Sequence, residues 1–353
     1  MTARFALIGT GWRAGFFYRA AKLLPERFEL TGVLCHSERG IAVAEEWHAR
    51  VYENLDKIMA DKPDFVVASV PGSAVADLAR FFAAHDMPVM FETYCSESVE
   101  AMTALYREVG GARIQVAEQY PFQPMHAARI STARSGVLGR VYQARASFIQ
   151  NYHAIAVLRR LLNIGMELPL VRAYKREDRR AAGPTRAGLP TEDRLENVAG
   201  EMFLLDYGDA AAIGDYESMQ QRSWIRHPVV MVRGERGEIL NDTVTYLKDI
   251  LTPITYTLLR SQAGTDGNLE GDYLRGIQGN GEWIYRTPYL PARMLDDEIA
   301  VAACMDSMAA YARGGEAFYP LEQAFQDHYI CLLIKEAANS GRAVQAVKQL
   351  WQR

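Results

Sequence analysis

The stretch Phe5-Ala-Leu-Ile-Gly-Thr-Gly-Trp-Arg-Ala14 decides the predicted fold of this 353-residue chain. A short apolar run leads into two glycines, and a helical pattern of apolar residues follows from Ala14 to Leu24. The spacing fits G-x-G-x-x-[GA], in which the first glycine allows a tight turn and the second allows close approach to the backbone. Such a turn aims free N–H groups at phosphates, so we predict phosphate-binding residues at Gly9, Thr10, Gly11, Trp12, Arg13 and Ala14.

Outward from this stretch, strand-like and helix-like runs alternate over the first third of the chain. Strands are expected at 30–35, 64–69, 88–91 and 114–117, and helices at 41–48, 54–60, 74–84 and 98–109. Because residues 65–68 are all apolar, this strand is predicted to be buried on both faces. The alternation predicts an α/β fold with a Rossmann-type, doubly wound parallel sheet, whose binding loops collect at one edge.

Beyond residue 120 the pattern changes to short strands separated by turns. A helix is expected at 125–134, and strands at 141–150, 202–207, 210–214, 223–226, 229–233, 238–240 and 243–247, with a hairpin turn at 279–281. The charge-rich segment 175–196 is interpreted as an exposed flexible loop rather than a binding surface. We therefore predict a dinucleotide-binding domain over 1–120. A substrate-binding and oligomerisation α+β domain follows over 121–353, with an open, mainly antiparallel sheet and closing helices at about 296–352.

Composition narrows the classes of function. The chain is 49% hydrophobic and 23% charged with a net charge of −4, which is ordinary for a globular protein and argues against a nucleic-acid partner. No apolar run is long enough to span a membrane, and no signal-peptide pattern is present at the N-terminus. Four cysteines are scattered without metal-binding spacing, so we expect reduced cysteines, no metal site and a cytoplasmic location.

The end of the second predicted strand bears on the choice between NAD and NADP. An NAD enzyme usually has an acid there to bind the ribose hydroxyls, whereas this chain has Cys35-His36-Ser37-Glu38-Arg39. Ser37 and Arg39 would suit a 2′-phosphate, and Arg13 could assist them. This favours NADP, with NAD as the alternative if Arg39 only faces solvent at a helix start and Glu38 binds the ribose.

The glycine motif, Val70-Pro71 after the third strand and Phe91-Glu-Thr-Tyr94 after the fourth resemble the Gfo/Idh/MocA oxidoreductases. Segments 116–124, 152–162, 297–302 and 319–328 are similar to the family's domain-crossing stretch, histidine-bearing helix and closing helices. The resemblance implies a Rossmann domain joined to an open antiparallel sheet, with NAD(P) and a sugar, cyclitol or polyol meeting in the cleft between them. The further predicted cofactor contacts are Val70, Pro71, Glu92, Thr93, Glu118 and Gln119.

Carried over residue by residue, the family pattern is incomplete. The family usually reads Glu-Lys-Pro after the fourth strand, and its lysine assists proton transfer; here those last two positions are Thr93 and Tyr94. The aspartate often found four residues before the catalytic histidine is Ile149, whereas His153 stands where the histidine is expected. One acid–base group of the family is therefore retained and two are absent.

His153 is the predicted proton carrier, because an unperturbed histidine titrates near pH 6.5. Tyr152 and Tyr120 are candidate hydroxyl donors, with packing or substrate contact as equal alternatives, and Glu92 could orient one of them. We expect Glu118 and Gln119, at the binding edge, to hold sugar hydroxyls or the nicotinamide amide.

The leading hypothesis is an NADP- or NAD-dependent oxidoreductase of sugar metabolism acting on a sugar-, cyclitol- or polyol-like alcohol or ketone. Two alternatives follow from the absent lysine and aspartate. One is a dinucleotide-binding sensor without turnover, and the other is an enzyme that retains its cofactor for net non-redox chemistry, such as elimination or glycoside cleavage. An open sheet is usually covered, so we also expect a homo-oligomer, a dimer or tetramer, formed through the C-terminal sheet.

Overall fold

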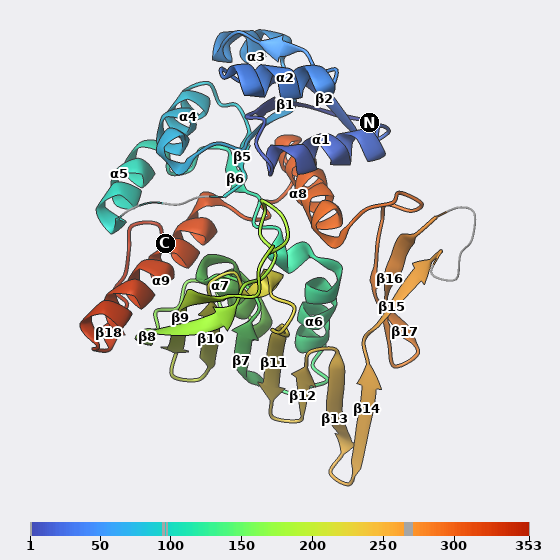
Figure 1. The fold of residues 1–353 in the computed structure, drawn as a ribbon, viewed down its shortest axis with the longest axis vertical. Helices are drawn as coiled ribbons and strands as arrows, with labels where there is room; N and C mark the ends of the chain where they lie inside the picture. Colours follow the sequence, from blue (N-terminus) through green and yellow to red (C-terminus); the bar gives the residue numbers. More distant parts are fainter. Residues whose placement is uncertain (1, 94–95, 97, 265–270, 353) are drawn as a thin grey trace.

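The computed structural model describes residues 2–93, 96, 98–264 and 271–352; Tyr94 and Cys95 lie outside the described residues. Its N-terminal part is a six-stranded parallel sheet of order β3-β2-β1-β4-β5-β6 with helices on both faces (Figure 1). The strands are β1 (Ala3–Ile8), β2 (Phe28–Leu34), β3 (Val51–Tyr52), β4 (Phe65–Ala68), β5 (Val89–Phe91) and β6 (Ile114–Val116). The helices are α1 (Ala14–Leu23), α2 (Glu38–Glu46), α3 (Leu55–Asp61), α4 (Gly72–Ala84) and α5 (Val99–Val109).

This sheet confirms the predicted Rossmann fold. All four residues of β4 are buried, as expected for a strand covered on both faces. Helices α1 and α2 contribute to the core on one face, and α3, α4 and α5 contribute to the core on the other. The strand order reverses between β1 and β4, and such a reversal places a binding crevice at the carboxyl ends of these strands. Only the two-residue β3 was missed, since it is too short to show a period.

The second sheet has nine strands in the order β14-β13-β12-β11-β7-β10-β9-β8-β18, and only the β7–β10 pair is parallel among the pairs described. A separate three-stranded sheet has the order β15-β16-β17. The first strands are β7 (Val141–Ser147), β8 (Leu170–Ala181), β9 (Leu195–Asp206), β10 (Ala211–Glu217), β11 (Val229–Gly234) and β12 (Gly237–Leu240). The others are β13 (Thr243–Asp249), β14 (Thr252–Thr257), β15 (Leu259–Ala263), β16 (Tyr273–Gly279), β17 (Glu282–Arg286) and β18 (Val344–Gln345).

Helices pack on one face of the nine-stranded sheet and leave the other open (Figure 1). They are α6 (Pro124–Arg134), α7 (Asn151–Leu162) and α9 (Leu321–Ser340), with 3-10 turns η1 (Tyr120–Phe122) and η2 (Gln220–Arg222) beside them. On β9, Phe203 and Leu205 are buried under the helices, while Met202, which precedes Phe203 and points to the opposite face, is 46% exposed. This alternation confirms a sheet with one covered face.

Two predictions in this region were wrong. Residues 223–226 form a turn rather than a strand. The loop predicted for the charged segment 175–196 is found only over 182–194, because residues 175–181 and 195–196 belong to β8 and β9, which pair from Leu170 opposite Asp206 to Ala181 opposite Leu195. Residues 174–179 are exposed on both faces, so the ladder hydrogen bonds rather than apolar burial define this hairpin, and no apolar alternation marks it in the sequence.

Helix α8 (Asp296–Ala312), which precedes α9 in the chain, returns to the N-terminal domain and packs beside α1 (Figure 1). The Arg19 Nε atom on α1 donates to Glu298 Oε1 on α8 at 2.6 Å. We propose the domain boundary at residues 120/121, since β6 ends the parallel sheet and β7 begins the mixed one, with α8 as a part of the second segment that covers the first domain.

A buried ion pair joins α7 to α9. The Arg159 guanidinium, 4% exposed, donates to the fully buried Asp327 carboxylate, which also accepts the hydroxyl of Tyr319. A second guanidinium nitrogen of Arg159 donates to Gln323 Oε1 at 2.8 Å. These bonds fix the orientation of α7, whose first turn carries His153.

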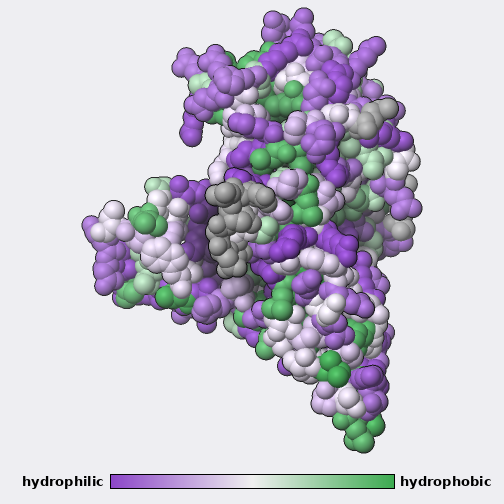
Figure 2. Space-filling model, turned by 90° about the vertical axis from the view of Figure 1, so that its right-hand side faces the viewer, coloured by the Kyte–Doolittle hydropathy of each residue, from purple (hydrophilic) through white to green (hydrophobic). Residues whose placement is uncertain are grey.

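The lower end of the molecule is apolar. The turn between β13 and β14 exposes Ile250 and Leu251 by 84% and 86%, and Figure 2 shows an apolar tip at that end of the molecule. Among the described residues, no helix combines the length and apolar character needed to cross a bilayer.

We expect Asp327→Asn to lower the free energy of unfolding by about 3–5 kcal/mol, because the Arg159 charge would remain buried without its partner. Urea denaturation followed by circular dichroism measures this change. As a matched control, Glu238→Gln removes the carboxylate partner of the exposed Arg233 and should leave the free energy of unfolding nearly unchanged. Equal losses in the two variants would contradict the anchoring role.

Candidate active site

The glycine loop after β1 has the geometry that its sequence predicts. Gly9 has a φ of +99°, and a Cβ atom there would lie 2.3 Å from the carbonyl oxygen of Ser69. A Cβ atom at Gly11 would meet nothing within 4 Å, so the protein leaves open space beside that backbone. Ala14 is fully buried at the start of α1. The protein fold therefore requires glycine at position 9, whereas the space beside Gly11 suits an approaching ligand.

The N-terminus of α1 is open to an anion. Arg13 occupies the N-cap position without a capping side-chain hydrogen bond, and the first turn carries no acidic residue. By contrast, Ser37 caps α2 by accepting the N–H of Gly40 at 3.0 Å. The N–H groups of Gly15 and Phe16 donate to the carbonyls of Gly11 and Arg13, so the N–H groups of the glycine loop just before them are the ones suited to bind phosphate oxygens.

The predicted ribose-binding residues lie at the start of α2. His36, Ser37, Glu38 and Arg39 are all exposed, and Glu38 is the first residue of the helix. Ser37 accepts a hydrogen bond as the N-cap, which leaves its hydroxyl hydrogen available to a ligand. On the other side of the loop, Val70 packs against Gly9, and Pro71 precedes α4.

Arg13 and Glu92 connect the glycine loop to the end of β5. The Arg13 Nε atom lies 2.8 Å from Glu92 Oε1, and both side chains are less than one-fifth exposed. Glu92 Oε2 accepts the hydroxyl of Thr93 at 2.9 Å. The Glu92 carboxylate is therefore bonded to Arg13 and Thr93, rather than to a tyrosine as the sequence pattern allowed. Arg13 and His153 line the same cavity.

His153 is held by a buried carboxylate. The histidine lies in the first turn of α7 and is 8% exposed, and its Nδ1 lies 2.8 Å from Oε2 of Glu118, which is fully buried just after β6. With Nδ1 facing Glu118, Nε2 is the ring nitrogen left for the cavity that His153 lines. Position 149, where the resemblance leads one to expect an aspartate, is an isoleucine, and the carboxylate beside the histidine comes from Glu118 instead. The sequence pattern predicts that Glu118 binds a ligand rather than that it contacts His153.

Two tyrosine rings surround His153. The Tyr120 ring centroid lies 4.5 Å from that of His153, and the Tyr152 ring meets the imidazole edge-on at 5.4 Å. Burial raises the pKa of the Tyr120 hydroxyl well above its usual value, and the charges of Asp297 and Glu118 act in the same direction. Tyr120 therefore stays protonated at neutral pH and can act as a hydrogen-bond donor.

These groups meet in one cavity of about 500 Å³ between the two sheets. Gln119 is 2% exposed and lines this cavity, and its Oε1 has no hydrogen-bond partner among the described residues. A buried amide oxygen without a partner calls for a ligand donor such as an amide or hydroxyl group. The lining residues are Trp12, Arg13, Glu92, Thr93, Gln119, Tyr120, Ile149, Gln150, Tyr152, His153, Arg186, Gln221, Arg222 and Asp297.

Sequence reasoning missed several of these residues. Arg186 belongs to the segment interpreted as an exposed loop, yet its guanidinium lies 4.5 Å from the Trp12 ring centroid at the cavity mouth. Arg222 and Asp297 reach the cavity from η2 and α8. No local spacing could have revealed them, because each lies far along the chain from the glycine loop.

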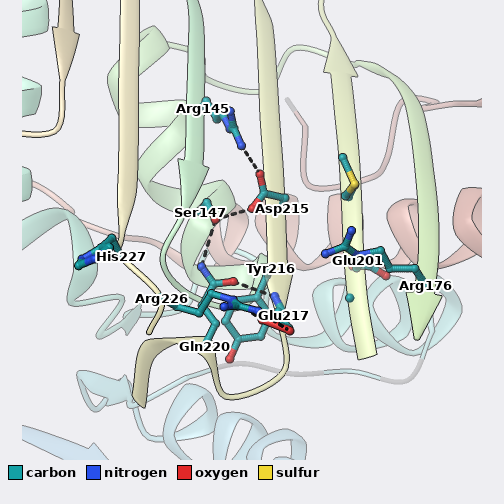
Figure 3. Close-up of a pocket in the computed structure, with 12 residues that line it drawn as sticks. Arg145, Ser147, Arg176, Glu201, Asp215, Tyr216, Glu217, Gln220, Arg226 and His227 are labelled. Atoms are coloured by element: carbon teal, nitrogen blue, oxygen red, sulfur yellow. Dashed lines mark hydrogen bonds and ion pairs between the residues drawn. The ribbon is translucent and has the colours of Figure 1, made fainter. Parts of the chain in front are cut away.

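A second pocket, of about 300 Å³, opens on the outer face of the nine-stranded sheet (Figure 3). Its arginines are paired with acids: Arg145 with Asp215 at 2.6 Å and Arg226 with Glu217 at 2.8 Å. None of the predicted site residues lines this pocket, so the cavity around His153 is the candidate active site. Within the described residues, no group of three or more histidine, cysteine or acidic side chains is arranged to hold a metal ion.

Comparison with known proteins bears on the fold of the chain and on the family of its N-terminal domain. A family model described as an oxidoreductase family with an NAD-binding Rossmann fold matches residues 3–119, which confirms the predicted resemblance over the N-terminal domain. A comparison with curated protein sequences gives no match.

Solved structures share the fold over nearly the whole chain. An NADH and levoglucosan complex of levoglucosan dehydrogenase has a TM-score of 0.70 at 16% identity, with 99% of this chain and 100% of that chain covered. An oxidoreductase from Agrobacterium radiobacter, bound to NAD+, L-tartaric acid and magnesium, has a TM-score of 0.67 at 16% identity, with 98% of each chain covered. An NAD-binding oxidoreductase from Klebsiella pneumoniae has a TM-score of 0.69 at 15% identity, with 99% and 100% covered. At these identities the likeness shows a common fold.

The two loop glycines should respond differently to substitution. Gly9→Ala combines backbone strain of about 1–3 kcal/mol with a clash against Ser69, so we expect a lower thermal midpoint. Gly11→Ala should keep the midpoint but weaken NADH binding at least tenfold, about 1.4 kcal/mol, because its methyl group occupies the open space. Scanning fluorimetry and NADH fluorescence titration measure the two effects. Unchanged NADH affinity in the folded Gly11→Ala variant would argue against a phosphate-binding loop.

Proposed function

We propose, from the premise that the N-terminal domain belongs to the Gfo/Idh/MocA family of NAD-binding oxidoreductases, that this chain oxidises a sugar-, cyclitol- or polyol-like alcohol or reduces the matching ketone. The observation that carries the proposal is the 2.8 Å contact between Glu118 and His153 in the wall of the cavity that the glycine loop also lines. A sensor without turnover would not need a histidine fixed in this way.

The residues present fit a nicotinamide dinucleotide. The open space at Gly11 and the uncapped α1 N-terminus would hold its pyrophosphate, and the Gln119 side chain, with its unpartnered oxygen, would meet the carboxamide or a substrate hydroxyl. When bound, the nicotinamide accepts or donates a hydride at C4.

His153 takes the proton from the substrate hydroxyl in the oxidation direction and returns it in reduction, through Nε2. Glu118 fixes the imidazole orientation through Nδ1 and stabilises the ring when it becomes charged. The Tyr120 ring packs at a tilt against the imidazole, and its hydroxyl can donate to a substrate oxygen. This arrangement replaces a proton path through a lysine, whose position is occupied by Thr93.

The ligands named for the structural neighbours support the substrate class. Levoglucosan dehydrogenase structures contain NADH with levoglucosan or with L-sorbose, both of them sugars. The cavity around His153 offers the donors and acceptors that several hydroxyl groups need, among them the Gln119 amide and the carboxylate of Asp297.

We further propose that NADP is preferred over NAD, because Ser37 and Arg39 are exposed at the start of α2 where the 2′-phosphate would lie. A homo-oligomer through the C-terminal sheet is supported by apolar side chains on the open face, such as the 67% exposed Tyr174 and the 46% exposed Met202. A cytoplasmic location remains a prediction from the scattered cysteines.

Replacing His153 with alanine should lower kcat at least tenfold, about 1.4 kcal/mol in the barrier, while NADH affinity stays the same. Nicotinamide absorbance across a panel of polyols and keto sugars provides the assay, and His85→Ala, an exposed histidine at the end of α4, is the matched control. If the wild type binds NADH but turns over no member of the panel, the sensor hypothesis replaces this one.

Cofactor preference offers a separate test. We expect Arg39→Ala to weaken NADPH binding about tenfold by removing a charge-assisted hydrogen bond, and to leave NADH binding unchanged. Arg107→Ala, which removes an exposed arginine from α5, controls for a general loss of positive charge. Tighter binding of NADH than NADPH by the wild type would instead assign the ribose to Glu38.

A further inference from the structure

Two cationic side chains of the cavity have no acidic partner. Among the described parts of the chain, neither Arg186 nor Arg222 forms an ion pair, although both line the cavity with His153. The third arginine there, Arg13, is neutralised by Glu92 at 2.8 Å. Two guanidinium groups are therefore available to a bound anion.

Each of these arginines is placed by ordered structure. Arg222 ends η2, which is anchored because Gln220 accepts the N–H of Glu217 at 2.8 Å and donates to Ser147 Oγ at 3.0 Å (Figure 3). Arg186 lies in the tight turn between β8 and β9, where the N–H of Thr185 donates to the carbonyl of Gly188 at 2.9 Å. Its guanidinium stacks on Trp12, and stacking leaves the N–H edge free to donate.

The lack of an acidic partner distinguishes Arg186 and Arg222 from the arginines of the neighbouring outer-face pocket. In the outer-face pocket, Arg145 bonds to Asp215 and Arg226 bonds to Glu217, and Figure 3 shows both contacts. The cavity does contain Asp297, but its Oδ1 accepts the amide of Gln123 at 2.6 Å rather than a guanidinium. Asp297 is suited to accept a substrate hydroxyl.

We propose that the substrate carries an oxyanion, the carboxylate of a sugar acid or the phosphate of a sugar phosphate, which Arg186 and Arg222 bind while the reacting carbinol carbon faces His153. This inference rests on the proposed function and narrows its substrate class. Guanidinium forks bind both kinds of oxyanion through paired, charge-assisted hydrogen bonds. A neutral sugar would make no such bonds with the exposed Arg186 or the half-buried Arg222.

The test compares each anionic probe with its neutral parent. Hexuronates and hexose 6-phosphates of the gluco, galacto and manno series are titrated by calorimetry into the protein saturated with NADH, alongside glucose, galactose and mannose, and the same pairs are assayed for turnover. The variants are Arg186→Gln and Arg222→Gln, with Arg222→Lys to restore the charge. Arg226→Gln, an arginine of the outer face, is the matched control.

We expect at least one anionic probe to bind tenfold or more tightly than its parent. Arg186→Gln and Arg222→Gln should abolish this advantage without changing NADH affinity, and Arg222→Lys should restore part of it. The more tightly bound series identifies carboxylate or phosphate as the group recognised.

Three results would overturn the inference: no anionic advantage in any series, an advantage that survives both glutamine variants, or a tenfold loss of NADH affinity, which would assign the arginines to the cofactor pyrophosphate. Arginine-dependent binding of an anionic probe without any change in nicotinamide absorbance would support the inference while contradicting oxidoreduction. Equal turnover of anionic and neutral probes would support oxidoreduction while contradicting the inference of an anionic substrate.

Discussion

The contact between Glu118 Oε2 and His153 Nδ1 links the two halves of the molecule at the site. Glu118 follows the last strand of the parallel sheet, and His153 begins the helix that packs under the mixed sheet. The carboxylate is fully buried, with Oε1 accepting the N–H of Tyr120 at 3.3 Å and Oε2 facing the imidazole, so a shift of α7 would leave Oε2 without this partner. The Arg159–Asp327 pair at the other end of α7 resists the same shift. The placement of the cavity wall thus depends on polar bonds at both ends of one helix.

Much of the fold could be predicted from the sequence because its signals are local. The glycine loop follows from a spacing of six residues, and the parallel strands follow from short apolar runs buried on both faces. The hairpin of β8 and β9 could not be predicted in the same way. Its charged residues face water on both sides, so its order depends on backbone pairing between residues up to 36 positions apart, from Leu170 to Asp206.

In the candidate site too, the residues marked by local patterns could be predicted, whereas the contacts between distant residues could not. His153 could be placed because a family pattern surrounds it, and Gly9 and Gly11 because their roles depend on adjacent residues. The pairing of Glu118 with His153 spans 35 positions, and Arg13 meets Glu92 across 79. Such contacts are set by strand order and helix packing, which residue spacing does not encode. Position 93, where the resemblance leads one to expect a lysine, is a threonine that donates to Glu92, and the same carboxylate pairs with Arg13 of the glycine loop.

The return of α8 to the first domain has a consequence for synthesis on the ribosome. The core on that face of the parallel sheet combines Phe5 and Phe17 with Met305 and Met308, which are translated almost 300 residues later. Until α8 emerges, the nascent Rossmann segment exposes the apolar surface that this helix will cover, so the amino-terminal domain completes its folding only after α8 has been translated.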